Sequence, residues 1–321
     1  MTSRMLIAYL FIIECSSVEN FLILLFCFKI LINFFVLVSL DGTTENCAVT
    51  NYPANNSNPA ALTYNNGAVL ACGGNYLKDA DHCWRFNGST WSQLPNSNQK
   101  HCQYDSPNVI VDEGWWVTGT LQTEDYYCTD SSTGEIFTGQ NWIPGPTLPG
   151  VDHPKGSCVV NLNSTHTMVI GGDPARKDAW LYGWSTKEWT RTGSLIQGRW
   201  AHGCVNLGDQ GVLVAGGYKG SKVDGCEVYT AELYNPTQGT WSNQPDLPQD
   251  IMPLFPILLN YDDVVLALFN QNDQIFKCSM GNGEWSVLKG VQLPNNVNVR
   301  GGYWDDKAAI VPETWSCNPA K

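Results

Sequence analysis

Short apolar strand patterns, each ending in a pair of glycines, recur along the chain after its first forty residues. GAVLACGG (67–74), THTMVIGG (165–172) and QGVLVAGG (210–217) are three copies of this pattern. Short apolar runs bounded by turn-forming residues predict β-strands that are buried on one or both faces. Glycine pairs predict tight turns that other residues adopt only with strain. The pattern therefore predicts an all-β chain of short strands.

The same series of residue types follows each strand pattern and completes a repeat. A turn, an aromatic residue, a tryptophan and then a leucine follow in order, as in CWRFNGSTWSQLP (83–95) and AELYNPTQGTWSNQPDLP (231–248). Two weaker copies begin at GWWVTG (114–119), with Thr118-Gly119 in place of the glycine pair, and at VVLALFN (264–270), with Phe269-Asn270 there. The marker tryptophans recur at intervals of 51, 47, 52 and 44 residues: Trp91, Trp142, Trp189, Trp241 and Trp285. Periods near 50 residues with several strands each are typical of β-propeller blades.

This order of elements resembles the kelch repeat, whose units contain an apolar strand, a glycine pair, a tyrosine and a tryptophan. The resemblance implies four-stranded blades packed around an axis, with the tryptophans buried between blades. A large aromatic side chain in such a position buries about 200 Å². The repeat positions expected to be structural are, besides the five tryptophans, the glycines Gly73, Gly74, Gly171, Gly172, Gly216 and Gly217.

The spacing predicts six blades. Residues 43–321, divided among six blades, give 46.5 residues each, close to the observed period. The segment 296–317 has the pattern of the first strands of a sixth unit, and 46–53 lies where an outer strand would complete it. Strands from both termini in one blade would remove exposed sheet edges. We therefore expect an all-β, six-bladed kelch-type propeller whose last blade is closed by an N-terminal strand.

The N-terminal segment has a different composition from the repeats. Residues 21–40 are almost wholly apolar, with Lys29 as the single charge, and a second apolar patch covers 5–13. Such a run predicts a targeting segment over 1–40, either a cleaved signal peptide or a signal anchor that spans the membrane. Under both alternatives the propeller domain, 41–321, is secreted or faces the extracellular space. The membrane is a partner only if the segment is retained.

Cysteines and sequons agree with that compartment. Ten of the twelve cysteines lie after residue 40, singly and without a CxxC pair, which favours five disulfides over a metal site. Cys72 and Cys83 end and begin neighbouring antiparallel strands, so we expect them to pair; Cys47 and Cys317 would lock the ring closure. The asparagines of three sequons, expected to carry glycan, are Asn55, Asn87 and Asn163.

The charge balance and the motifs of the sequence exclude several classes of function. The chain has 30 Gly, 17 Pro and only 15% charged residues, a balance that favours turns over long helices. Eighteen Lys and Arg against 30 Asp and Glu give a net charge of −12 with no basic cluster, which excludes nucleic acid as a partner. No Gly-x-Ser-x-Gly, HExxH or phosphate-loop motif occurs.

Two enzyme classes on related propellers remain as alternatives. A galactose-oxidase-like copper radical oxidase would need two histidines, two tyrosines and a Tyr–Cys crosslink, and a sialidase-like hydrolase would need an arginine cluster. Among the five histidines, His202 lies in Arg199-Trp200-Ala201-His202, which resembles the kelch strand opening. We expect no enzyme and no cofactor, but a protein-binding module whose protein or glycan ligand, of unknown identity, sits at the propeller loops.

Overall fold

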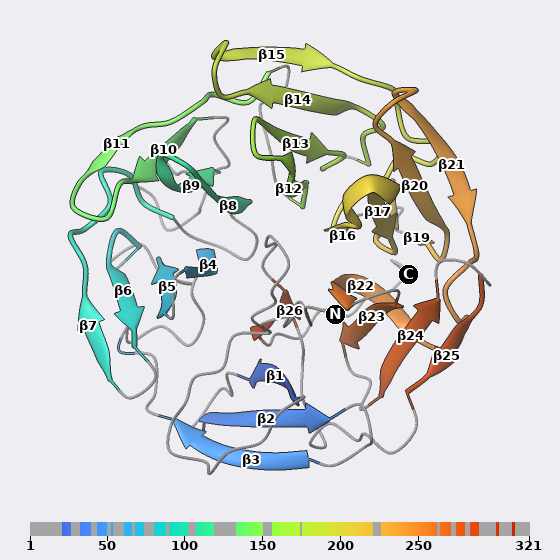
Figure 1. Ribbon diagram of the computed structural model, residues 1–321, viewed down its shortest axis with the longest axis horizontal. Helices are drawn as coiled ribbons and strands as arrows, with labels where there is room; N and C mark the ends of the chain where they lie inside the picture. Colours follow the sequence, from blue (N-terminus) through green and yellow to red (C-terminus); the bar gives the residue numbers. More distant parts are fainter. Residues whose placement is uncertain are drawn as a thin grey trace, which may run out of the picture.

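The computed structural model is an all-β propeller (Figure 1). Outside the terminal strands it describes residue 53 and the ranges 61–65, 68–73, 80–87, 90–101, 107–118, 133–149, 156–173, 175–220, 226–261, 264–270, 274–279 and 283–288.

Five sheets of four antiparallel strands form consecutive blades, and in each blade the strands follow one another from the axis outward. Blade 1 contains β4 (Ala61–Asn65), β5 (Ala68–Cys72), β6 (Cys83–Phe86) and β7 (Trp91–Gln93). Blade 2 contains β8 (Asn108–Val111), β9 (Gly114–Thr118), β10 (Gly134–Phe137) and β11 (Trp142–Pro144). Blade 3 contains β12 (Cys158–Asn163), β13 (His166–Ile170), β14 (Ala179–Gly183) and β15 (Glu188–Arg191).

The same order continues in the last two of these blades. Blade 4 contains β16 (Gly203–Asn206), β17 (Val212–Ala215), β20 (Ala231–Asn235) and β21 (Thr240–Gln244). It also has a short 3-10 helix, η2 (Gly208–Gln210), and a two-stranded sheet of β18 (Tyr218–Lys219) and β19 (Cys226–Glu227). Blade 5 contains β22 (Met252–Tyr261), β23 (Val264–Asn270), β24 (Ile275–Ser279) and β25 (Trp285–Val287).

The prediction of six four-stranded blades was wrong in its count, because five such blades form. A different, five-stranded sheet lies between β7 and β25, in the order β26-β27-β1-β2-β3 (Figure 1). Its strands are β1 (Phe21–Phe26), β2 (Asn33–Ser39), β3 (Thr44–Val49), β26 (Arg300–Gly301) and β27 (Ile310–Val311).

The physical reason lies in the lengths of the paired segments. The C-terminal strands β26 and β27 comprise two residues each, whereas β1 and β2 pair with each other from Phe21↔Ser39 to Phe26↔Phe34. Apolar segments this long satisfy their backbone groups best as a hairpin, so they take up the central strands of this sheet. The assignment of 1–40 as a signal or anchor stays a prediction. In the described part of the chain, no helix has the length and apolar character needed to cross a membrane.

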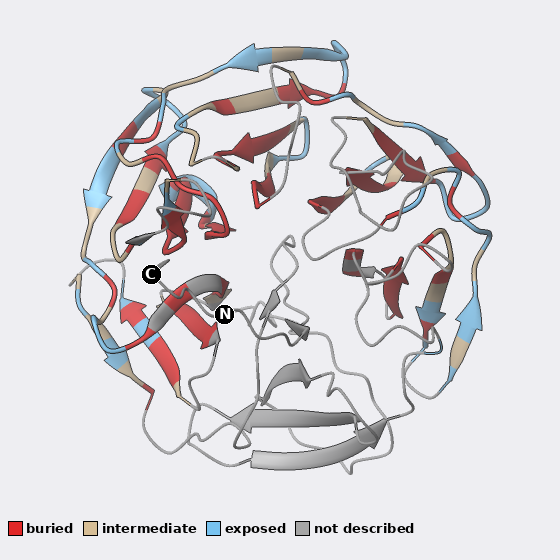
Figure 2. Cartoon of the chain, turned by 180° about the vertical axis from the view of Figure 1, so that it is seen from behind, coloured by how far each residue is buried: buried red, intermediate tan, exposed pale blue. Residues whose placement is uncertain are grey.

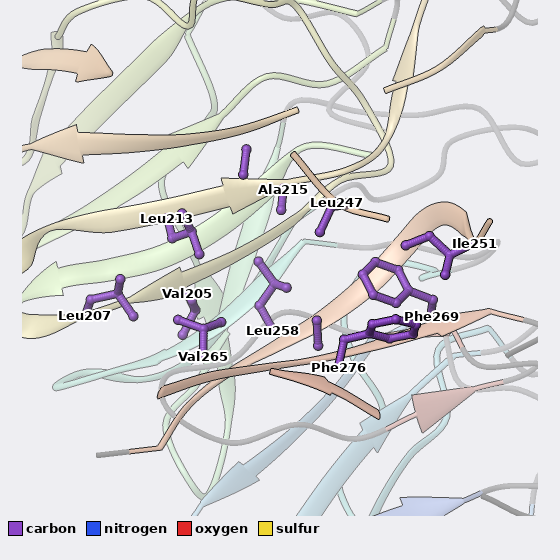
Figure 3. Packing of buried hydrophobic residues seen from close by; sticks show 12 residues of the cluster. Val205, Leu207, Leu213, Ala215, Leu247, Ile251, Leu258, Val265, Phe269 and Phe276 are labelled. Atoms are coloured by element: carbon purple, nitrogen blue, oxygen red, sulfur yellow. The ribbon is translucent and has the colours of Figure 1, made fainter. Parts of the chain in front are cut away.

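The hydrophobic core lies between the blades. Successive side chains of a strand point to opposite faces of its sheet, so a strand with both faces covered needs an unbroken apolar run. Val212 and Val214 of β17 join a cluster shared with blade 3. Leu213 and Ala215 join a cluster shared with blade 5 (Figure 3). The inner strands are accordingly buried, while the outermost strands expose much of their surface (Figure 2).

The marker tryptophans join each blade to the one before it. Their indole N–H groups donate to backbone oxygens of the segment that leaves the preceding blade: Trp142 to Pro95 (2.9 Å), Trp241 to Gly193 (2.7 Å) and Trp285 to Pro245 (3.2 Å). Trp142 and Trp241 are buried, and Trp91, Trp189 and Trp285 are half-buried. Each of these three tryptophans therefore supplies apolar contact area and a directed hydrogen bond between blades.

Glycine pairs allow the second strand to turn against the next linking segment. Gly171 and Gly172 have φ of 62° and 114°, and Gly216 and Gly217 have φ of 75° and 96°, a region that favours glycine. A Cβ on Gly171 would lie 2.5 Å from the backbone oxygen of Arg199. Gly73 of blade 1 has φ of 71°, whereas Gly74 lies outside the described residues.

Candidate binding face

One end of the propeller combines the loops after each second strand with the segments that link consecutive blades. The loop 171–178 of blade 3 is hydrogen-bonded along its length to the linking segment 195–202. Gly172 N–H donates to Arg199 O (3.0 Å), Arg199 N–H to Arg176 O (3.1 Å) and Leu195 N–H to Lys177 O (2.8 Å). We call the described residues of this end between blades 3 and 4, namely 171–173, 175–178, 195–202 and 218–220, the loop face.

A buried aromatic stack lies beneath the loop face between blades 3 and 4. The rings of Trp200 and Tyr218 lie 5.3 Å apart at 28°, and their backbones exchange two hydrogen bonds of 3.1 and 2.8 Å. The Trp200 indole donates to Gly220 O (3.1 Å). With Ala201 they form a small hydrophobic cluster, against which Ala175 packs, separate from the cores between the blades. The chain thus adds structure here, in β18 and β19, that blade packing does not require.

Two alanines of the loop face adopt the left-handed region. Ala175 has φ of 63° and Ala201 has φ of 54°. A non-glycine residue in this conformation costs about 1–2 kcal/mol. Ala201 is buried, and its N–H donates to Gly156 O (2.8 Å), which holds the strained conformation in place. Retained strain of this kind clusters at functional sites.

A buried ion pair fixes the linking segment beneath the stack. Arg199 and Glu232 of β20 are fully buried, with the guanidinium Nη2 at 2.7 Å from the carboxylate. Arg199 Nη1 also donates to Gly216 O (2.9 Å) and Thr230 O (2.8 Å). Burial lowers the pKa of Arg199 from its usual range, and Glu232 opposes that shift. The same Glu232 accepts the N–H groups of the two linking residues Ile196 (2.7 Å) and Gln197 (3.0 Å).

His202 lies next to this pair and is completely buried. Desolvation, and then the charge of Arg199, hold the pKa of His202 well below its usual range. The imidazole is therefore neutral at physiological pH. Arg199 and His202, noted in the sequence as a strand-opening pair, lie under the loop face and support it.

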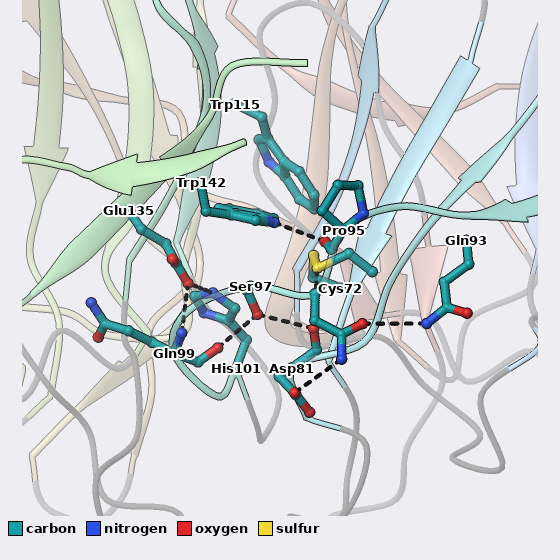
Figure 4. The surroundings of a disulfide bond; sticks show 12 residues. Cys72, Asp81, Gln93, Pro95, Ser97, Gln99, His101, Trp115, Glu135 and Trp142 are labelled. Atoms are coloured by element: carbon teal, nitrogen blue, oxygen red, sulfur yellow. Dashed lines mark hydrogen bonds and ion pairs between the residues drawn. A yellow bond between two sulfur atoms is a disulfide. The ribbon is translucent and has the colours of Figure 1, made fainter. Parts of the chain in front are cut away.

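We call the contact between a linking segment and the blade that follows it a joint. In the joint between blades 1 and 2, a buried glutamate again holds the linking segment, but through different residues (Figure 4). Glu135 of β10 is buried and accepts the N–H groups of Asn98 (3.1 Å) and Gln99 (3.2 Å). Its third donor is the imidazole Nε2 of His101, at 2.8 Å. His101 therefore stands at the place that Arg199 holds in the other joint.

Two disulfides are present in the described part of the chain. Cys72 and Cys83 pair between β5 and β6, where they are register partners with Cα atoms 4.1 Å apart, close to the His101 joint (Figure 4). Cys158 and Cys204 pair between the innermost strands of blades 3 and 4, with Cα atoms 6.1 Å apart.

Sequence reasoning missed the second bridge, although a signal was present. Cys158 and Cys204 are 46 residues apart, one repeat, and stand at equivalent places near the start of their strands. Cys278 of β24 is buried and has no disulfide, contrary to the expectation that all ten cysteines pair. Burial raises the pKa of its thiol. The predicted Cys47–Cys317 bridge lies outside the described residues; only the backbone of Cys47 is placed, in β3.

The described sequons lie at the opposite end from the loop face. Asn87 is exposed in the turn between β6 and β7, where its Oδ1 accepts the N–H of Thr90 (2.9 Å). Asn163 is exposed at the turn between β12 and β13, where its Oδ1 accepts the N–H of Thr165 (2.9 Å). In an antiparallel blade these two turns share one end, and the loop after the second strand lies at the other. Asn55 lies outside the described residues, and glycosylation of all three stays a prediction.

Titratable groups do not assemble into a metal centre within the described ranges, where no three His, Cys, Asp or Glu side chains could hold an ion. His101 bonds to Glu135, His202 is buried beside Arg199, and His153 lies outside the described residues.

Comparison with known proteins bears on the repeat directly. A family model for the kelch motif matches residues 199–248, from the linking segment before blade 4 to its exit. Residues 199–248 therefore contain a kelch motif. The chain is 31% identical over 113 residues to "Kelch-like protein 35" of Mus musculus, covering 35% of this chain and 18% of the relative. It is 28% identical over 117 residues to "F-box/kelch-repeat protein At1g80440" of Arabidopsis thaliana, covering 34% and 32%.

The kelch chain therefore matches less than a third of the length of these relatives. Among solved structures, "Structure of YjhT" is similar with a TM-score of 0.59 and 13% identity, covering 79% of this chain and 90% of that one. At this identity the likeness shows the propeller fold alone.

Proposed function

We propose that this kelch propeller is an extracellular protein-binding module and that its ligand contacts the loop face. The observation that carries the proposal is the structure built on that face between blades 3 and 4. The Trp200–Tyr218 stack, the β18–β19 hairpin and the left-handed Ala175 and Ala201 lie outside the blade cores. Binding residues are found preferentially on loops that a rigid scaffold positions.

The position of the sequons supports this choice of face. Glycans on Asn87 and Asn163 would project from the opposite end of the propeller and leave the loop face uncovered. The kelch relatives support a binding role at the level of the fold, while the compartment rests on the apolar 21–40 segment and the disulfides. We assign no catalytic role, and the oxidase and sialidase alternatives gain no site among the described residues.

Site-specific photo-crosslinking tests the face. Lys219 of β18 is exposed beside the stack, and Asp209 of η2 is exposed on the same blade at the opposite end. A photoreactive amino acid at position 219 should form adducts with cell-surface or extracellular proteins of the source organism, and one at position 209 should not. Adducts from 209 alone, or none from 219, would overturn the assignment. Digestion of the adduct by protease or by glycosidase distinguishes a protein ligand from a glycan.

Secretion of the full chain tests the compartment separately. We expect the product in the medium, with an N-terminus near residue 41 if the segment is cleaved or a membrane-bound product if it is retained. A full-length product in the cytosol with reduced cysteines would contradict both alternatives.

A further inference from the structure

Two joints of the propeller have a buried glutamate at the same position of the repeat, but the side chain that faces the glutamate differs between them. In the joint between blades 3 and 4, Glu232 faces Arg199, whose guanidinium stays charged at every physiological pH. In the joint between blades 1 and 2, Glu135 faces His101 at 2.8 Å, and both side chains are buried, with exposed fractions of 1% and 0%. Histidine is the residue whose charge changes between about pH 5 and pH 8. The second joint therefore contains a proton-dependent cation where the first has a permanent one.

Among the residues that the structure describes, one carboxylate is directed at His101. Glu135 approaches from β10, and the ring of Trp142 from β11 lies 6.1 Å away. The carboxylate of Asp81, on the segment before β6, accepts instead from the side-chain amide of Asn96 (3.2 Å). His82, next along that segment, is half-buried, and Lys100 on the linking segment is exposed to solvent.

We propose that the His101–Glu135 pair is a pH-sensitive clasp that tightens the joint between blades 1 and 2 in mild acid and loosens it as the pH rises. When the imidazole is neutral, the buried carboxylate of Glu135 has only neutral donors and no counter-charge. Protonation of His101 converts the same contact into an ion pair with a charge-assisted hydrogen bond, which is about twice as strong as a neutral one.

One feature of the site opposes protonation. The Nδ1 of His101 is buried and has no hydrogen-bond partner among the described residues, so a second N–H there would be unsatisfied. A missing neutral hydrogen bond costs less free energy than a buried carboxylate without its counter-charge. The ion pair therefore outweighs the unsatisfied N–H, and protonation stabilises the joint. The added stability therefore depends on His101 carrying a proton beside Glu135.

Hydrogen exchange of the backbone amides bound to the two carboxylates tests the clasp with an internal reference. Exchange is measured on the intact protein at about pH 5.5 and pH 7.5 and corrected for intrinsic rates. Protection of Asn98 and Gln99, which donate to Glu135, should fall about tenfold at the higher pH relative to Ile196 and Gln197, which donate to Glu232. A ratio that stays constant, or that rises with pH, would overturn the proposal.

Substitution of the cation gives the second readout. His101→Arg places the permanent cation of the other joint beside Glu135 and should abolish the pH dependence of the ratio. Lys100→Gln removes an exposed charge from the same segment and should leave the dependence intact. If the protection ratio of His101→Arg still depends on pH, a group other than His101 is responsible, and the proposal is wrong. If that variant fails to fold, the comparison within the native protein still decides.

Discussion

Removal of the Arg199 guanidinium should destabilise the propeller strongly, because it leaves Glu232 charged and buried. Both groups have no exposed surface, and Arg199 additionally donates to the backbone oxygens of Gly216 and Thr230. Loss of one partner of a buried ion pair costs about 3–5 kcal/mol. We therefore expect Arg199→Met to lower the free energy of unfolding by about 4 kcal/mol, a large part of the 5–15 kcal/mol typical of a folded protein.

Urea denaturation followed by tryptophan fluorescence measures this change, and a surface pair provides the matched control. Arg191 pairs with Asp178, but its side chain is 56% exposed. Arg191→Met should change the free energy of unfolding by less than about 1 kcal/mol, since exposed pairs contribute little. Adding Glu232→Gln to Arg199→Met should recover part of the loss, because the amide still accepts the linking-segment N–H groups without a buried charge. Equal effects of the two arginine substitutions would refute the assignment of a buried, structural ion pair.

Three further predictions concern the joints between blades. Trp241→Phe keeps the ring but removes the donor to Gly193 O and should lower the free energy of unfolding by about 1–2 kcal/mol in the same assay. Replacing Cys158 and Cys204 together by serine should lower it by about 2–4 kcal/mol relative to the oxidised protein; no difference would argue against the bridge. The buried thiol of Cys278, whose pKa is raised by burial, should react with a maleimide only after unfolding, as mass spectrometry of native and denatured samples can show.

The blades were predictable because each repeat folds locally in sequence. A strand pattern, a glycine turn and a marker tryptophan specify four strands that pair in chain order, and the structure forms them in all five copies. The blade count was not predictable in the same way. The remaining sheet pairs β1 with β27 in parallel, and the repeat pattern of the C-terminal segment does not show that β1 and β2, rather than further C-terminal strands, lie beside it.

The sequence indicates the buried carboxylates of the joints only weakly. Glu135 and Glu232 each stand two residues before the aromatic residue of the third strand, Phe137 and Tyr234, so the two positions are equivalent in the repeat. Their donors are mostly backbone N–H groups of the preceding linking segment. Backbone donors carry no residue identity, so sequence patterns cannot reveal such a contact.

The distribution of these carboxylates connects the joints to the loop face. Trp84, Trp180 and Phe276 occupy the equivalent position in blades 1, 3 and 5, and none of these side chains can accept a hydrogen bond as a carboxylate does. Two joints have a buried carboxylate. The joint in which Arg199 is the cation lies beneath the Trp200–Tyr218 stack. A surface whose support is fixed before binding loses less conformational entropy when a ligand arrives. The loop face between blades 3 and 4 therefore stands where the chain has its pH-independent anchor, and the proposed pH-dependent clasp lies two blades away.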